Sequence, residues 1–75
     1  MDKLTKLISD ILNIDADKII DDLSIKEVPS WDSLKHIELI VAIEQDFNIQ
    51  LSFDEIASMQ SVRKIKEVID KKIIG

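Results

Sequence analysis

The sequence predicts an all-α fold, a small four-helix bundle with three longer helices and a short third one, in a single domain of residues 1–75. Two observations favour this class: apolar residues recur at helical spacing in separate segments, and no segment alternates long enough to predict a strand. Apolar residues make up 45% of the chain and charged residues 33%, as in a globular domain. A chain this short hides only about 60% of the surface that its unfolded form exposes, which leaves little room for a deep active site.

The first helix is predicted from apolar residues at i, i+3, i+4, i+7 and i+8, which share one helical face. These residues are Leu4, Leu7, Ile8, Ile11 and Leu12. Asp2 is a candidate N-cap. Residues 14–31 lose this period and predict a long loop, pinned to the core by some of its aliphatic side chains. Such a loop of about 18 residues is unusual in so small a domain and is often functional.

The other three helices are predicted from their start signals. Pro29 disfavours helix just before it, so the second helix begins afresh near residue 32 and covers 33–47, a segment of good helix formers. Ser52 and Glu55 form a capping box for a short helix. Ser61 can cap the last helix. Its apolar stripe consists of Val62, Ile65, Val68, Ile69 and Ile73.

The second predicted helix carries two apolar groups where a monomeric bundle needs only one. At about 100° per residue, one sector holds His36, Leu39, Ile40, Ile43 and Phe47, and this sector suits the core. The other sector holds Leu34, Ile37 and Val41, flanked by Glu38, Glu44 and Gln45, with Ser33 near its edge. Either the domain covers this second group, or it is an exposed apolar strip rimmed by carboxylates that docks a partner.

Charge and hydropathy limit the classes of partner. The net charge of −5 disfavours nucleic acid, and the acids concentrate in residues 13–60, which suits partners with basic patches or simply favours solubility. No apolar run approaches the roughly 20 residues that span a bilayer, and no signal-peptide pattern opens the chain. A cytoplasmic location is therefore expected. The absence of cysteine excludes disulfides and thiolate metal sites.

Four short segments follow one another along the second helix: Asp32-Ser33-Leu34, Ile37-Glu38-Leu39, Ala42-Ile43-Glu44 and Asp46-Phe47. Together they resemble the prosthetic-group motif and second helix of acyl carrier proteins. The resemblance continues through Ile49, Leu51, Asp54-Glu55 and Val62, so it covers nearly the whole chain. An Asp-Ser-Leu tripeptide alone is weak evidence, but at a helix start after a long loop in an acidic 75-residue chain it is strong.

The resemblance implies a non-catalytic, monomeric carrier whose Ser33 receives a 4'-phosphopantetheine arm from a phosphopantetheinyl transferase that uses coenzyme A and magnesium. Acyl groups would ride on the arm as thioesters, and Asp32 and Leu34 would lie beside the attachment site. Acyl-loading, elongating or acyltransferase enzymes with basic patches would dock on Leu34, Ile37, Glu38, Val41 and Glu44. The acyl chain would lie between the second and third helices, against Ile40, Ile43, Leu51, Ile56 and Met59. No metal held by the chain itself is expected.

Some residues depart from the family pattern. Lys35 and Gln45 stand where fatty-acid carriers usually have acids, which predicts a specialised carrier for a polyketide, lipid or surface-glycan route. Ile56 stands where alanine is frequent, which predicts a shallow pocket for short or polar acyl groups. The alternatives are an aminoacyl carrier, D-alanyl or peptidyl, and an unmodified helical interaction domain. Peptidyl carriers usually have glycine in place of Asp32, which disfavours them.

Three further patterns are candidates for chemistry of their own. Ser33 and His36 could form a nucleophilic pair, but nothing suggests an oxyanion hole, so a partly buried, hydrogen-bonded histidine is predicted. Trp31, where the family usually has a small residue, would anchor the loop against the bundle or contact a transferase or the arm. The acidic segment that begins at Asp15 lacks the glycine and glutamate of a calcium loop, which disfavours a calcium site.

Overall fold

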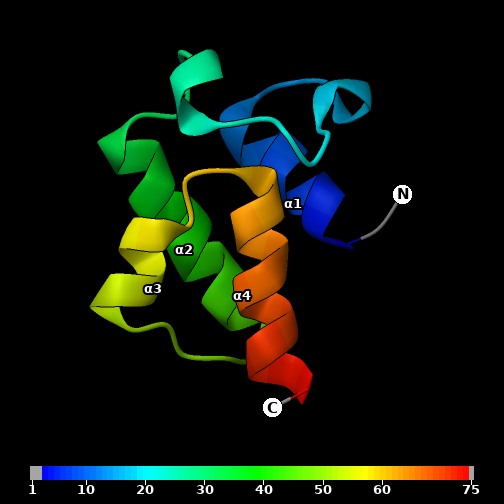
Figure 1. Ribbon diagram of the computed structural model, residues 1–75. Helices are drawn as coiled ribbons and strands as arrows, with labels where there is room; N and C mark the ends of the chain where they lie inside the picture. The colour runs from blue at the N-terminus through cyan, green and yellow to red at the C-terminus, as the bar shows by residue number, and fades with distance from the viewer. Residues whose placement is uncertain (1–2, 75) are drawn as a thin grey trace.

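The computed structural model describes the backbone of residues 3–74 and the side chains of residues 3–73, and it confirms the all-α prediction (Figure 1). Two short 3-10 turns, η1 and η2, lie in the long loop between the first two helices, and no strand occurs within residues 3–74. The predicted N-cap Asp2 lies outside the described residues. In chain order the elements are α1 (Lys3–Leu12), η1 (Ala16–Lys18), η2 (Ile25–Glu27), α2 (Ser33–Phe47), α3 (Phe53–Ser58) and α4 (Val62–Ile74).

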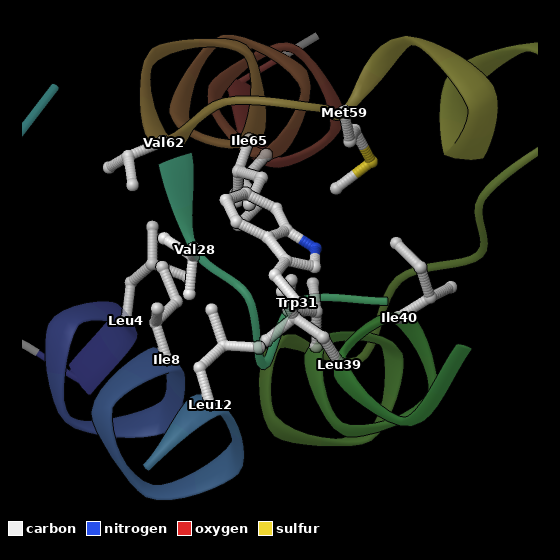
Figure 2. Close-up of a cluster of buried hydrophobic side chains, with 12 residues drawn as sticks. Leu4, Ile8, Leu12, Val28, Trp31, Leu39, Ile40, Met59, Val62 and Ile65 are labelled. Carbon is white, nitrogen blue, oxygen red and sulfur yellow. The ribbon is translucent and has the colours of Figure 1, made fainter. Parts of the chain in front are cut away.

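The core lies between α1, α2 and α4, and Trp31 from the end of the loop stands in its middle (Figure 2). Trp31 is 2% exposed, so it anchors the loop against the bundle, as one of the two interpretations predicted. The indole fills space in the core that side chains of the helices would otherwise have to fill. The other buried residues are Leu4, Ile8, Leu12, Val28, Leu39, Ile40, Ile43, Met59, Val62, Ile65 and Ile69.

The long loop is bound to the start of α4 by backbone hydrogen bonds. The amide of Val62 donates to the carbonyl of Leu23 at 2.9 Å, and the amide of Ile25 donates to the carbonyl of Gln60 at 2.9 Å. Figure 1 shows the loop running across the end of the bundle at which α4 begins. These bonds satisfy main-chain polar groups of the loop and of the segment at the start of α4.

Two ion pairs reinforce the same junction. The Lys66 ammonium lies 2.7 Å from the Asp21 carboxylate, and Arg63 pairs with Asp22. Hydrogen bonding and attraction from Lys66 hold the pKa of Asp21 below its ordinary value, and the hydrogen bond that Arg63 donates to Asp22 raises the pKa of Arg63. All four side chains are largely exposed, so the pairs fix the position of the loop more than they add stability.

The capping predictions hold for α3 and α4. In the capping box of α3, the Ser52 amide donates to Glu55 Oε1 at 2.8 Å, and the Glu55 amide donates to Ser52 Oγ at 3.2 Å. The Lys64 amide donates to Ser61 Oγ at 3.2 Å at the start of α4. No helix in the described part of the chain is long and apolar enough to cross a membrane.

Candidate functional site

Ser33 is the first residue of α2, and the local sequence fixes this start. Asp32 has an extended backbone and acts as the N-cap, because its Oδ1 accepts the amide hydrogen of Lys35 at 2.9 Å. The first helical hydrogen bond joins the amide of His36 to the carbonyl of Asp32 at 2.8 Å. Ser33 is exposed, and among residues 3–74 no group forms a hydrogen bond with its hydroxyl. The hydroxyl is therefore presented to solvent.

This position suits a phosphodiester. The unpaired N–H groups of a first helical turn and the helix dipole favour a negative group there by roughly 0.3–1 kcal/mol. Lys35 adds a positive charge in the same turn, although it also pairs with Glu38 at 3.2 Å. The capping carboxylate of Asp32 is engaged with the backbone. A phosphopantetheine on Ser33 thus fits the residues that surround the hydroxyl.

The second apolar group of α2 is exposed, which excludes the interpretation that the domain covers it. Leu34 is 68% exposed, Ile37 is 55% exposed and Val41 is 46% exposed. The long loop does not cover them, because it packs on α4 and the core instead. These three residues, called the apolar strip below, run along α2 from its serine end.

The carboxylates beside the strip differ in their surroundings. Glu38 is exposed and forms its ion pair with Lys35 on the helix surface. Glu44 is half-buried, and its Oε2 accepts the amide hydrogen of Leu51 at 2.9 Å. Glu44 therefore also holds the connection between α2 and α3, a structural contact that the helical spacing alone did not indicate.

The residues predicted to line an acyl pocket lie together on the core side of α2 and α3. Ile40, Ile43 and Met59 are 3%, 0% and 0% exposed, and Leu51 and Ile56 are half-buried and pack against the same core cluster. An open groove of about 360 Å³ lies elsewhere, and none of these five residues lines it. The groove is bordered by Lys3, Leu4, Phe47, Lys66, Ile69, Asp70 and Ile73, at the end of α2 opposite Ser33.

His36 is partly buried and hydrogen-bonded through both ring nitrogens, as the sequence predicted. The indole Nε1–H of Trp31 donates to Nδ1 of His36 at 3.0 Å, and Nε2 of His36 lies 2.9 Å from the carbonyl oxygen of Ile56. Both nitrogens are thus occupied, so the ring has no free lone pair to take a proton from Ser33. The Ile56 carbonyl could not be predicted as a partner of His36, because a main-chain acceptor has no side-chain signature.

Among the described residues, the start of α2 thus combines an exposed hydroxyl without a hydrogen bond, at Ser33, with an exposed apolar strip on the same helix. The family model for the phosphopantetheine attachment site matches residues 2–69. An acyl carrier protein from Buchnera aphidicola is 40% identical over 70 residues, which span 93% of this chain and 89% of the relative. The polyketide-8 synthase acyl carrier protein 2 from Streptomyces avermitilis is 28% identical over 72 residues, 96% of this chain and 83% of the relative.

A solved structure agrees with these relatives. The solution structure of the holo acyl carrier protein from Geobacter metallireducens superposes with a TM-score of 0.85 at 27% identity, covering 95% of this chain and 82% of that one. The chain belongs to the acyl carrier protein family. It is a non-catalytic carrier, and its cofactor is a covalently attached 4'-phosphopantetheine.

Proposed function

We propose that Ser33 is the attachment residue and that the chain shuttles acyl groups between enzymes. The observation that carries this proposal is the exposed, unbonded hydroxyl at the first position of α2. Other serines lack this combination: Ser30 donates to the carbonyl of Leu12 at 2.7 Å, and Ser52 is used in a capping box.

The arm, once attached, supplies a terminal thiol on which acyl groups are carried as thioesters. The residues of the chain bind and orient. Asp32 fixes the start of α2 through its cap and contacts the transferase, and Leu34 provides an apolar contact beside the serine. The helix dipole stabilises the phosphodiester at the point where the arm begins.

The apolar strip is the docking surface for partner enzymes in this proposal. Leu34, Ile37 and Val41 would pack on the partner, and Glu38 and Glu44 would face its basic residues. The partners are a phosphopantetheinyl transferase and acyl-loading, elongating or acyltransferase enzymes. We also propose that residues 1–75 act as one monomeric domain in the cytoplasm.

The cargo proposed is a short or polar acyl group in a specialised route. Lys35 neutralises part of the acidic surface that a housekeeping partner would meet, since it pairs with Glu38. Only a shallow acyl pocket is proposed, against Ile40, Ile43, Leu51, Ile56 and Met59, because these side chains are buried or half-buried in the unloaded chain. Loading by the transacylase of fatty-acid synthesis tests the specialisation, and loading as efficient as that of a housekeeping carrier would contradict it.

The attachment itself is tested by intact mass spectrometry after incubation with coenzyme A, magnesium and a broad-specificity transferase. The wild-type chain should gain one phosphopantetheinyl group, and Ser33→Ala should gain none. Ser58→Ala is the matched control, since Ser58 is also an exposed serine on a helix, and it should load like the wild type. A wild-type chain that stays unmodified would overturn the proposal.

A further inference from the structure

The hydrogen bonds of His36 determine its tautomer. Indole N–H is a donor only, so Nδ1 of His36 must accept from Trp31 and carries no proton. The carbonyl of Ile56 is an acceptor only, so Nε2 must carry the proton and donate to it. The ring is therefore neutral, and it joins the end of the long loop to the end of α3 through the first turns of α2.

This junction lies at the serine end of the bundle. His36 follows Ser33 by three residues, which places both near the start of α2, and Ile56 lies in α3. Figure 1 shows α3 beside α2, so the bond from His36 to Ile56 spans the seam between the two helices. An acyl chain carried on an arm at Ser33 would have to pass this seam to enter the apolar interior between α2 and α3.

The space behind the seam is already occupied. Trp31, Ile40 and Met59 are 2%, 3% and 0% exposed and belong to one cluster of buried side chains. In Figure 2 the indole nitrogen of Trp31 is directed toward the side of the core on which Ile40 and Met59 lie. Close-packed side chains admit a further group only if elements move apart, and a separation of α3 from α2 breaks the bond from His36 to Ile56.

We propose that His36 is a positioning residue whose hydrogen bond to the Ile56 carbonyl, called the clasp below, holds α3 against α2. This bond restricts the carrier to cargo that remains largely outside its core. The inference rests on the proposed function, because it concerns an acyl group carried near Ser33. The clasp is then the determinant of cargo specificity. Short acyl groups are carried without a loss of stability, and longer acyl chains bury little of their apolar surface in the protein.

The clasp is tested first without any cargo. In the unmodified protein, long-range ¹H–¹⁵N correlation spectra report which nitrogen of His36 is protonated. The expected spectrum is that of the Nε2–H tautomer, which the two hydrogen bonds require. A ring protonated on Nδ1, or one that exchanges freely between tautomers as in an unfolded chain, would overturn the clasp whether or not Ser33 can be loaded.

The second test uses a series of acyl forms made from acyl-coenzyme A and a broad-specificity transferase, with loading verified by mass. For the wild type, Tm should change by less than about 2 °C between the butanoyl and octanoyl forms. His36→Leu removes the donor to Ile56, so in this variant the same step should raise Tm by about 13–26 °C, as four additional buried methylenes would. His36→Gln keeps an N–H donor at a similar reach and should restore the flat profile.

The outcomes separate the two proposals. A chain that gains no arm overturns the proposed function. A chain that loads, but whose wild-type Tm rises with acyl length as steeply as expected for His36→Leu, overturns the clasp and leaves the carrier function intact. A flat wild-type profile together with a rising His36→Leu profile supports the clasp, and if His36→Leu does not fold, the wild-type series and the tautomer still decide.

Discussion

The substitution Trp31→Ala should remove a large part of the stability of this domain. Truncation of a buried tryptophan costs about 3–5 kcal/mol, and the indole here is 2% exposed. The same change removes the donor to Nδ1 of His36, and an unpaired, partly buried acceptor costs about 1–3 kcal/mol more. A domain of 75 residues has a free energy of unfolding of about 4–11 kcal/mol, so at least about a third of it and up to the whole would be lost.

Two further variants serve as controls. One keeps the aromatic packing of Trp31 but removes its N–H donor, and the other removes an exposed aromatic side chain. Trp31→Phe keeps most of the apolar contact but loses the N–H donor, so a smaller loss of about 1–2 kcal/mol is expected. Phe53→Ala truncates an aromatic residue that is 81% exposed, and it should change the free energy of unfolding by less than about 0.5 kcal/mol.

The assay is urea denaturation followed by far-UV circular dichroism, since Trp31 is the only tryptophan and its removal abolishes the fluorescence signal. The expected order of stability is wild type close to Phe53→Ala, then Trp31→Phe, then Trp31→Ala. If Trp31→Ala lost no more than Phe53→Ala, the indole would not fill the core as described and the reasoning would be refuted.

Three other predictions follow from single residues. The pKa of Glu55 is lowered in the folded state because the Ser52 amide donates to its carboxylate and the Lys72 ammonium lies 2.9 Å away. The contribution of Glu55 to folding stability is therefore complete above its unfolded pKa of 4.5 and is lost as the pH falls through the lowered pKa of the folded state. The Tm of the wild type should fall on acidification through this range, and the Tm of Glu55→Gln should fall less. Asn48 ends α2 at φ 55°, so Asn48→Ala should destabilise by about 1 kcal/mol in urea melts and Asn48→Gly should not. Ile37→Ser alters only an exposed side chain, so Tm should stay within about 3 °C while partner docking measured by calorimetry weakens; tighter or equal docking would argue against the apolar strip.

The helices of this chain could be predicted because each carries a local signal. The capping box at Ser52 and the apolar period of residues 4–12 depend on neighbours within one or two turns, and the structure agrees with both. The division of α2 into two faces followed from helical geometry alone. The exposure of the apolar strip had to come from the structure, because the position at which the long loop packs determines whether the loop covers the strip.

The loop and its junctions could not be predicted in the same way. The bonds from Ile25 and Val62 join segments that are more than 30 residues apart, and they are main-chain bonds that leave no mark in the sequence. The hydrogen bond from His36 to the carbonyl of Ile56 likewise joins segments that are distant in the sequence, and its acceptor is a main-chain group. The 3-10 turns within residues 14–31 were missed because runs of three residues are too short to show a period.

The central claim, that Ser33 alone is presented for attachment, is tested most directly by locating the group on the loaded chain. Trypsin cleavage after Lys26 and Lys35 yields a peptide, residues 27–35, that contains both Ser30 and Ser33. Fragment spectra of this peptide should place the whole phosphopantetheinyl mass on Ser33, because the Ser30 hydroxyl is committed to the Leu12 carbonyl. Modification at Ser30, or at any serine outside this peptide, would contradict the account.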